Sequence, residues 1–241
     1  MKPPGLDISG LTLAYGAQTL FRDLALGVPA GRFMVMLGAS GVGKSSLLRV
    51  AAGLASPMAG CVTATDGQLL QGRIAWMGQQ DLLYPWLTIL DNVMLGARLR
   101  RQQQDRRRAL DLLERVGLGG RAGSLPAELS GGMRQRAALA RTLYEDRPIV
   151  LMDEPFSALD SITRTRVQDL AAGLLVGRTV LMITHDPLEA CRMGQLLVVL
   201  SGTPATLTAP VALAGDAPRP PDDAEVLRMM GRLLRVLSAA A

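Results

Sequence analysis

The stretch from Phe33 to Ser46, FMVMLGASGVGKSS, constrains the fold more than any other part of the chain. Its first five residues are all apolar, which is typical of a strand buried on both faces of a parallel sheet. A glycine-rich turn follows, and the apolar residues Leu47, Leu48 and Leu54 beyond it indicate a helix. A strand, a turn and a helix in this order form one arm of a βαβ unit, so the sequence predicts an α/β fold.

The turn, Gly38 to Ser45, matches the pattern G-x-x-x-x-G-K-[ST] of phosphate-binding loops. Its glycines let the backbone curl so that N–H groups point at a β-phosphate, and Lys44 adds positive charge toward the β- and γ-phosphates. Ser45 is placed to put its hydroxyl on Mg²⁺. We therefore expect a bound nucleotide. The residues expected to contact it are Gly38, Ala39, Ser40, Gly41, Val42, Gly43, Lys44, Ser45 and Ser46.

A second apolar run, residues 149–152, leads into two acidic residues, Asp153 and Glu154. At the tip of a buried strand Asp153 is placed to hold Mg²⁺, directly or through water. Because side chains alternate along a strand, Glu154 is expected to point elsewhere, which makes it a candidate general base for an attacking water. The alternative is a pair of acidic residues at the exposed end of a strand.

The single histidine, His185, follows a third apolar run at 179–184. A lone histidine is more often structural than catalytic. In an open α/β sheet, however, ligands bind beyond the carboxyl ends of the strands, and the two other runs already end in candidate catalytic motifs. We therefore expect His185 beside the nucleotide. A fourth run at 196–200 completes the predicted core.

The segments outside this core differ in their patterns. Short apolar segments alternate with glycine before Phe33, which predicts small antiparallel strands. Residues 91–128 have helical periodicity and high charge, which predicts a helical insertion. Beyond Gly202 a Pro- and Ala-rich stretch predicts a loose connector. The final stretch, AEVLRMMGRLLRVLS, predicts a helix with one apolar face, which either packs on its own domain, the favoured alternative, or binds a partner.

Composition excludes some classes of protein. With 49% hydrophobic and 20% charged residues, the 241-residue chain is expected to fold rather than to be disordered. No apolar run is long enough to span a bilayer, and the first residues lack the apolar core of a signal peptide. Cys61 and Cys191 have no metal-ligand spacing and are expected to be reduced, buried thiols.

The charge of the chain is positive, +5, and 24 of its 26 basic residues are arginine. The densest group lies between Arg98 and Arg108 and is offset by few acidic residues. A solvated helix face is the favoured interpretation, and contact with nucleic acid or anionic lipid is the alternative.

The stretch from Leu129 to Leu143, LSGGMRQRAALARTL, has the pattern of a second anion site. A Ser-Gly-Gly turn enters a helix whose first turn offers unbonded backbone N–H groups. A plain serine N-cap is the alternative, but it explains the helix and not the two glycines.

Taken in order, these motifs resemble the ATP-binding subunit of ABC transporters. The resemblance rests on GASGVGKS, Gln79 in WMGQQ, LSGGM, IVLMDEP followed by SALD, and THD, and it covers about residues 5–205. It implies a P-loop NTPase core with an N-terminal antiparallel β subdomain and a helical subdomain inserted at about 81–135. The nucleotide-binding domain then occupies 1–205, and a connector and amphipathic helix occupy 206–241.

The resemblance also assigns roles to individual residues. Tyr15 resembles the aromatic residue that stacks on adenine, with an ordinary strand tyrosine as the alternative. Gln79 resembles the glutamine that senses Mg²⁺ and the attacking water, with Gln80 as the fallback. His185 resembles the histidine that contacts the γ-phosphate, and Asp160 resembles the acid that crosses the dimer interface.

For the Ser-Gly-Gly turn the resemblance implies which anion it binds. Ser130, Gly131 and Gly132 are expected to bind the nucleotide held by Lys44 of a second copy, so that two chains close head to tail over two ATP molecules. The expected activity is ATP hydrolysis coupled to solute import, with ATP and Mg²⁺ bound. The expected location is the cytoplasmic face of the inner membrane.

The same resemblance implies partners. A membrane permease is expected to insert a short coupling helix near Tyr84 to Asn92, and a periplasmic or lipid-anchored solute-binding protein is expected to deliver the solute. No nucleic-acid partner is expected, because the chain has one cassette and no heptad run, unlike ABC ATPases that act on nucleic acid or ribosomes.

For the solute, the stretches LLYPWLTILDNV and LSGGMRQRAALARTL resemble importers of nitrate, taurine, other sulfonates and thiamine-precursor pyrimidines. The stretch RTVLMITHDPLEACRMG favours the pyrimidine group, such as hydroxymethylpyrimidine. Nitrate, taurine and aliphatic sulfonates stay as alternatives.

Overall fold

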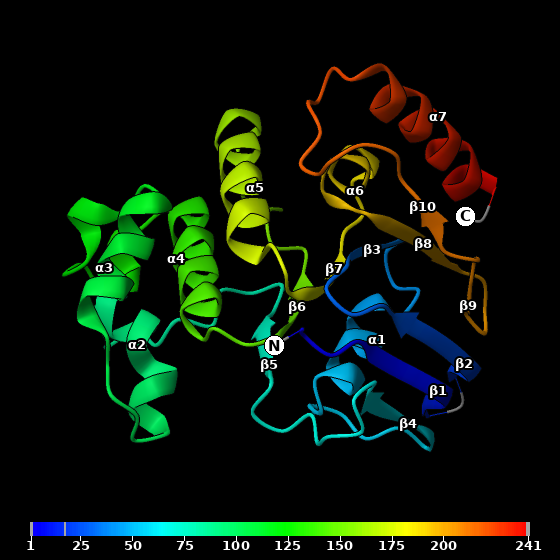
Figure 1. Ribbon diagram of the computed structural model, residues 1–241, viewed down its shortest axis with the longest axis horizontal. Helices are drawn as coiled ribbons and strands as arrows, with labels where there is room; N and C mark the ends of the chain where they lie inside the picture. Colours follow the sequence, from blue (N-terminus) through cyan, green and yellow to red (C-terminus); the bar gives the residue numbers. More distant parts are fainter. Residues whose placement is uncertain (1, 17, 240–241) are drawn as a thin grey trace. The chain divides into compact units, whose positions relative to one another are not determined.

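The computed structural model describes residues 2–16 and 18–239, in which two compact units are distinguished (Figure 1). The first unit comprises the chain up to Ile74, Pro148–Glu154 and the chain from Gly177 onward. The second comprises Ala75–Arg147 and Pro155–Val176. The segment predicted as a helical insertion, 81–135, lies within the second unit.

An antiparallel sheet forms the N-terminal part of the first unit. Its strand order is β2 (Gln18–Val28), β1 (Leu6–Tyr15) and β4 (Ala59–Ala64). Buried and less buried residues alternate along β1, as expected for a strand with one face toward the core. The predicted antiparallel strands are thus confirmed. Cys61 is exposed on β4, however, so the prediction that it is a buried thiol is wrong.

A second sheet holds the core of this unit, and its strands run through the apolar segments predicted from the sequence. Strands β8 (Leu196–Ser201), β3 (Phe33–Gly38), β7 (Thr179–Ile183) and β6 (Ile149–Asp153) are parallel and lie in that order. Every residue of β3, β6 and β7 is buried, because helices cover both faces of such sheets. The predicted α/β fold is confirmed.

The parallel register brings the carboxyl ends of the core strands to one edge. Gly38 is paired with Leu200, and Asp153 is paired with Ile183. Helix α1 (Lys44–Ala51) begins a few residues after β3 and contacts β6. The turn after β3, the two acids at the end of β6 and the residues after β7 therefore leave the sheet on the same side.

The C-terminal part of the first unit is more ordered than its composition indicates. The short strands β9 (Thr206–Leu207) and β10 (Val211–Ala212) both pair antiparallel with β8. Helix α7 (Ala224–Ala239) then contacts α6 (Pro187–Met193), and Val226 on α7 is buried. Backbone pairing to β8 holds a segment whose side chains alone predict a loose connector.

The second unit is mainly helical. Strand β5 (Ile74–Met77) leads into it, and two 3₁₀ turns, η1 (Gly119–Arg121) and η2 (Pro126–Glu128), precede its third helix. Its helices are α2 (Ile89–Leu99), α3 (Arg106–Arg115), α4 (Gly131–Tyr144) and α5 (Ser161–Leu175). Helices α2, α3 and α4 contact one another, and α4 contacts α5. No helix in the described part of the chain has both the length and the apolarity to cross a bilayer.

Candidate functional site

The glycines of the turn after β3 are required for different reasons. Gly41 and Gly43 have φ angles of +81° and +105°, a left-handed region that glycine adopts readily. A Cβ on Gly43 would lie 2.8 Å from Cζ of Phe21, and one on Gly38 would lie 2.5 Å from the carbonyl oxygen of Leu200. A Cβ on Gly41 would meet no heavy atom within 4 Å. Packing thus requires glycine at 38 and 43, whereas Gly41 faces open space.

The N-terminus of α1 is left without a compensating group from the chain. Its N-cap is Gly43, which has no side chain to accept a hydrogen bond, and the first turn contains no acidic residue. The N–H groups and partial positive charge of a helix start are therefore available to an anion. Phosphate fits this donor set.

We predict that Gly43→Ala weakens ATP binding strongly. An L-residue in the left-handed region costs about 1–2 kcal/mol, and the new Cβ would also collide with Phe21, so the loop must shift away from its phosphate-binding shape. Equilibrium binding of a fluorescent ATP analogue measures the effect. Gly173→Ala on α5 is the matched control, because a Cβ there meets nothing within 4 Å. Equal affinity in the two variants would contradict the prediction.

The Lys44 side chain lies buried inside the turn. Its Nζ donates hydrogen bonds to the carbonyl oxygens of Gly38 at 2.8 Å and Ala39 at 2.9 Å. Burial lowers the pKa of Lys44 from its ordinary value, while the nearby carboxylates of Glu154 and Asp153 act in the opposite direction. The loop backbone, the last residue of β6 and the acid that follows it thus meet at this ammonium group.

Asp153 is buried at the end of β6, and the Ser45 side chain forms a hydrogen bond with it. Burial raises the pKa of Asp153 above its ordinary value, the hydrogen bond with Ser45 lowers it in part, and the charge of Glu154 raises it further. A carboxylate and a hydroxyl side by side are oxygen ligands of the kind Mg²⁺ prefers. The pair fits the magnesium site predicted from the sequence.

Glu154 lies beyond the end of β6, so strand alternation does not explain its direction. Its φ angle is +48°, and its backbone N–H donates to the carbonyl oxygen of Ile183 at 2.9 Å. This turn brings Oε1 of Glu154 to 3.0 Å from Nδ1 of His185. A non-glycine residue held in this region costs of order 1–3 kcal/mol and is commonly found at functional sites. The acid that follows β6 and the only histidine of the chain thus form one contact.

Tyr15 stands at the end of β1, on the antiparallel sheet, and is 56% exposed. Phe21, on the neighbouring strand β2, is the residue that limits space at Gly43, so this sheet reaches the phosphate-binding turn. An exposed aromatic ring at this sheet is available for stacking on a flat ligand.

The Ser-Gly-Gly turn lies in the second unit, where Ser130 is the N-cap of α4. Its hydroxyl accepts a hydrogen bond from the Met133 N–H at 3.3 Å. A Cβ on Gly132 would lie 3.1 Å from the carbonyl oxygen of Ala158, so close packing explains this glycine. A Cβ on Gly131 would meet only the end of the Arg134 side chain at 3.9 Å. Packing therefore leaves Gly131 unexplained.

The two other candidates of the second unit lie in different settings. Gln79 follows β5 in an exposed bend beside the equally exposed Gln80, so exposure does not distinguish the two. Asp160 is the N-cap of α5 and accepts a hydrogen bond from the Thr163 N–H at 3.0 Å. This backbone hydrogen bond lowers the pKa of Asp160.

Sequence reasoning missed the role of Asn92. Its side chain is fully buried on α2, where Nδ2 donates to the carbonyl oxygens of Tyr84, Leu87 and Thr88 at 3.1, 3.1 and 3.0 Å. Its Oδ1 accepts from the Tyr84 N–H at 2.7 Å. One side chain therefore holds both ends of the loop at 84–88. The available signal was a polar residue on the apolar side of a helix.

The loop held by Asn92 presents two aromatic side chains. Tyr84 is 43% exposed and Trp86 is 71% exposed. Their rings lie edge to face, with centroids 5.4 Å apart. Large exposed aromatic residues of this kind are enriched at protein interfaces.

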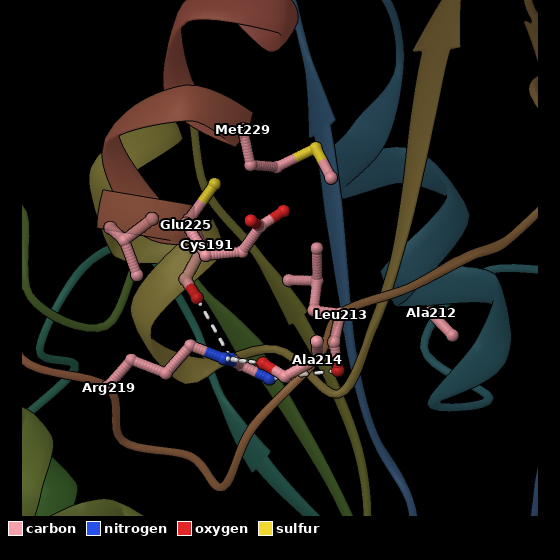
Figure 2. Close-up of a pocket in the computed structure, with 8 residues that line it drawn as sticks. Cys191, Ala212, Leu213, Ala214, Arg219, Glu225 and Met229 are labelled. Atoms are coloured by element: carbon pink, nitrogen blue, oxygen red, sulfur yellow. Dashed lines mark hydrogen bonds between the residues drawn. The ribbon is translucent and has the colours of Figure 1, made fainter. Parts of the chain in front are cut away.

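Sequence reasoning also missed Arg219, which lies at a small cavity of about 90 Å³ in the first unit (Figure 2). Its guanidinium group donates to backbone carbonyl oxygens of the segments on either side, those of Cys191, Gly194, Leu213, Ala214 and Gly215. Burial raises the pKa of the neighbouring Cys191 thiol to about 11, so the thiol stays protonated. Arg219 thus fastens the C-terminal segment, and the cavity offers no nucleophile.

Comparison with known protein families gives one match relevant to this site. Residues 21–157 match the family described as "ABC transporter". An uncharacterized ABC transporter ATP-binding protein of Haemophilus influenzae is 44% identical over 239 residues, covering 95% of this chain and 97% of that protein. An aliphatic sulfonates import ATP-binding protein, SsuB 1 of Rhodococcus jostii, is 43% identical, covering 95% and 92%. SsuB 1 of Pseudomonas syringae pv. syringae is 38% identical, covering 98% and 97%.

Solved structures give the same match. The ATP-binding cassette MJ0796, solved as a dimer in a post-hydrolysis state bound to ADP and Pi, has a TM-score of 0.78 and 31% identity, covering 88% of this chain and 100% of that chain. An ATP-binding subunit of an ABC transporter has a TM-score of 0.76 and 26% identity, covering 86% and 90%. Both likenesses extend well beyond the motifs of the site.

Proposed function

The chain belongs to the ABC transporter family as an ATP-hydrolysing subunit, and from this premise we propose that it drives import of an aliphatic sulfonate through a membrane permease. The observation that carries the hydrolytic part of the proposal is the 3.0 Å contact between Glu154 and His185, next to the pair formed by Asp153 and Ser45. A subunit that only binds nucleotide needs no such base. Its proposed location is the cytoplasmic face of the inner membrane.

Nucleotide binding in this proposal uses groups already turned toward the site. The N-terminus of α1 and the Lys44 ammonium hold the phosphates, and Tyr15 stacks on the adenine. Ser45 and Asp153 hold Mg²⁺, with Gln79 as a further contact. When bound, Mg²⁺ neutralises charge that develops on the phosphate oxygens during transfer.

Hydrolysis in this proposal is assigned to Glu154 and His185. Glu154 takes a proton from the attacking water, as a general base placed beside the γ-phosphate. The imidazole of His185 holds the Glu154 carboxylate through its 3.0 Å contact and lies near the γ-phosphate. Because the left-handed backbone of Glu154 directs its side chain toward His185, the pair is set before the nucleotide arrives.

Two copies are proposed to share each nucleotide. Ser130, Gly131 and Gly132 of one chain cover the γ-phosphate held by Lys44 of the other, and Asp160 lies at the interface between the chains. The bare surroundings of Gly131 support this assignment, because a backbone without a side chain allows close approach of a phosphate. The dimer of MJ0796 bound to ADP and Pi is a relative in which two cassettes assemble.

The permease is proposed to dock on the loop at 84–88. Tyr84 and Trp86 supply exposed aromatic surface, and Asn92 gives that surface a fixed backbone. A coupling helix seated there transmits the opening and closing of the nucleotide dimer to the membrane.

We expect Trp86→Ala to impair transport by the complete transporter more than hydrolysis by the isolated subunit. Loss of a central aromatic contact costs 2 kcal/mol or more, so permease-stimulated hydrolysis and uptake should fall by about 30-fold. ATP turnover of the isolated subunit should stay unchanged, because Trp86 is remote in sequence from every phosphate-contacting motif. Uptake into vesicles carrying the reconstituted transporter measures the effect. Leu69→Ala, which removes another exposed apolar side chain, is the control.

Asn92→Leu provides the matching change at the buried residue. Leucine has a similar volume but leaves the Tyr84 N–H and the Leu87 carbonyl without their partner, each at a cost of about 1–3 kcal/mol. The carbonyls of Tyr84 and Thr88 keep the hydrogen bonds that the Leu87 and Asn92 N–H groups donate to them. The coupling defect of Trp86→Ala should recur, together with a change in Trp86 fluorescence in the isolated subunit. Normal uptake in both variants would contradict docking at this loop.

The choice of solute rests on relatives. The interpretation of the cargo as a thiamine-precursor pyrimidine has no support among them, whereas several proteins 37–43% identical are named as aliphatic sulfonate import subunits. The sulfonate alternative therefore fits better and replaces it. A solute-binding protein that delivers the sulfonate outside the membrane is part of the proposed system.

Calorimetry on that solute-binding protein tests the cargo directly. The protein is titrated with an alkanesulfonate, taurine, nitrate and hydroxymethylpyrimidine, and we expect it to bind the alkanesulfonate. ATP-dependent uptake of the same compound by the complete transporter should follow. Binding of the pyrimidine alone would overturn the choice of cargo and leave the ATPase role intact.

A further inference from the structure

The net positive charge of the chain equals that of one short segment. The eleven residues 98–108, RLRRQQQDRRR, contain six arginines and one aspartate, so they carry +5, which equals the charge of the whole chain. The rest of the chain contains 20 basic and 20 acidic residues, which cancel. We call residues 98–108 the basic loop. It joins α2 to α3.

The basic loop is fastened at both ends to the last residue of α4 and to the segment that follows it. The Asp105 N–H donates to the hydroxyl of Tyr144 at 2.8 Å, and Arg100 forms an ion pair with Glu145 at 2.6 Å. Arg108 lies over the Tyr144 ring, 5.5 Å from its centroid, and forms an ion pair with Asp146 at 3.4 Å. These contacts present the loop in a defined conformation.

The other four arginines of the loop, Arg98, Arg101, Arg106 and Arg107, are exposed. No acidic side chain within residues 2–16 and 18–239 is found in an ion pair with them. Arg106 and Arg107 occupy the first turn of α3, where positive charge opposes the helix dipole, and the N-cap Asp105 is the single carboxylate at this helix start. An anionic surface would offset this unfavourable arrangement.

One apolar side chain lies among these arginines. Leu99 is 72% exposed and is flanked by Arg98 and Arg100. An exposed leucine within a basic segment suits the headgroup region of a bilayer, which accepts both the charge and the apolar group. The loop contains no aromatic residue on which a nucleic-acid base would stack. These features favour a lipid surface over nucleic acid.

We propose that the basic loop binds anionic lipid headgroups. Arg98, Arg101, Arg106 and Arg107 contact the headgroups, and Leu99 enters the interfacial region. The proposed permease-bound location supplies the membrane that the loop meets in the cell. Binding itself requires neither the permease nor ATP, so it is measured on the isolated subunit.

Co-sedimentation with vesicles tests the proposal. Vesicles of phosphatidylcholine and phosphatidylglycerol should bind the subunit, and vesicles of phosphatidylcholine alone should not. Changing all four exposed arginines to glutamine should lower the partition coefficient by about five-fold per arginine, roughly several hundred-fold in all. ATP turnover of the isolated variant should be unchanged, which shows that it is folded.

A variant with the same total charge is the control. Changing Arg121, Arg166, Arg232 and Arg235 to glutamine removes four exposed arginines from other parts of the chain. This variant should retain most of the vesicle binding. Equal losses in the two variants would overturn the proposal, since binding would then follow total charge and not the basic loop.

Two further experiments test the role of Leu99 and distinguish lipid binding from nucleic-acid binding. Leu99→Ser should weaken vesicle binding without changing its salt dependence, because no charge is removed. Binding of a duplex oligonucleotide that depends on the four arginines, without binding to anionic vesicles, would overturn the proposal in favour of nucleic acid. If the subunit binds anionic vesicles but the complete transporter takes up no sulfonate, the result would count against the proposed transport function and not against this inference.

Discussion

Glu154→Gln is expected to lower the rate of ATP turnover by about 10²- to 10⁴-fold while leaving ATP binding intact. The amide has the shape of the carboxylate but cannot accept the proton of the attacking water. His185 lies 3.0 Å from Glu154, so the contact can persist with an amide oxygen in the same place. Release of phosphate measures turnover, and equilibrium binding of ATP measures affinity.

The same variant is expected to accumulate as a dimer when ATP is present. If hydrolysis opens the dimer, a chain that binds ATP without hydrolysing it stays closed, which size-exclusion chromatography with light scattering detects. Glu225→Gln on α7 is the control, because it removes an equal charge from an exposed position. A monomeric Glu154→Gln variant with full turnover would refute the assignment of the general base.

Ser130→Arg should abolish hydrolysis without abolishing ATP binding by the single chain. The substitution removes the N-cap of α4, at a cost of about 1 kcal/mol, and adds a bulky cation where the γ-phosphate of the second copy is proposed to lie. Loss of preorganised donors at a reacting phosphate lowers turnover by about 10²- to 10³-fold. Ser130→Ala separates the two effects, since it removes the cap alone and should be milder.

Mixing two inactive variants tests the shared site directly. In a dimer of one Ser130→Arg chain and one Lys44→Ala chain, the first chain keeps its phosphate-binding turn and the second keeps its Ser-Gly-Gly turn. If each site takes these two turns from different chains, one of the two sites is intact. The mixture should therefore regain part of the turnover. If both turns served the nucleotide of their own chain, every site in the mixture would carry a defect, and no activity would return.

Much of the fold could be predicted because its signals are local. Four apolar runs became the parallel strands β3, β6, β7 and β8, since strands buried on both faces require continuous apolar sequence. The connector after Gly202 was predicted less well, because its order comes from backbone pairing with β8 and from a buried arginine, Arg219. Neither contact leaves a periodic pattern in the sequence.

The candidate site divides in the same way. Contiguous motifs predicted the proposed phosphate-binding turn, the acids after β6 and the single histidine as candidates. The direction of Glu154 depends on a left-handed backbone angle beyond the strand end, which alternation along a strand does not describe. Asn92 appeared in the sequence as one more residue of an amphipathic helix, although its side chain makes four hydrogen bonds to the 84–88 loop.

The sequence by itself determined the class of fold, the nucleotide chemistry and the family, because those depend on short stretches whose residues act together with their neighbours. Only the tertiary structure decided which residues separated along the chain meet: Glu154 with His185, Phe21 with Gly43, Gly132 with Ala158, and the basic loop with the end of α4 and the segment after it. Such contacts depend on the packing of whole elements. No local pattern encodes where two distant segments come within hydrogen-bonding distance.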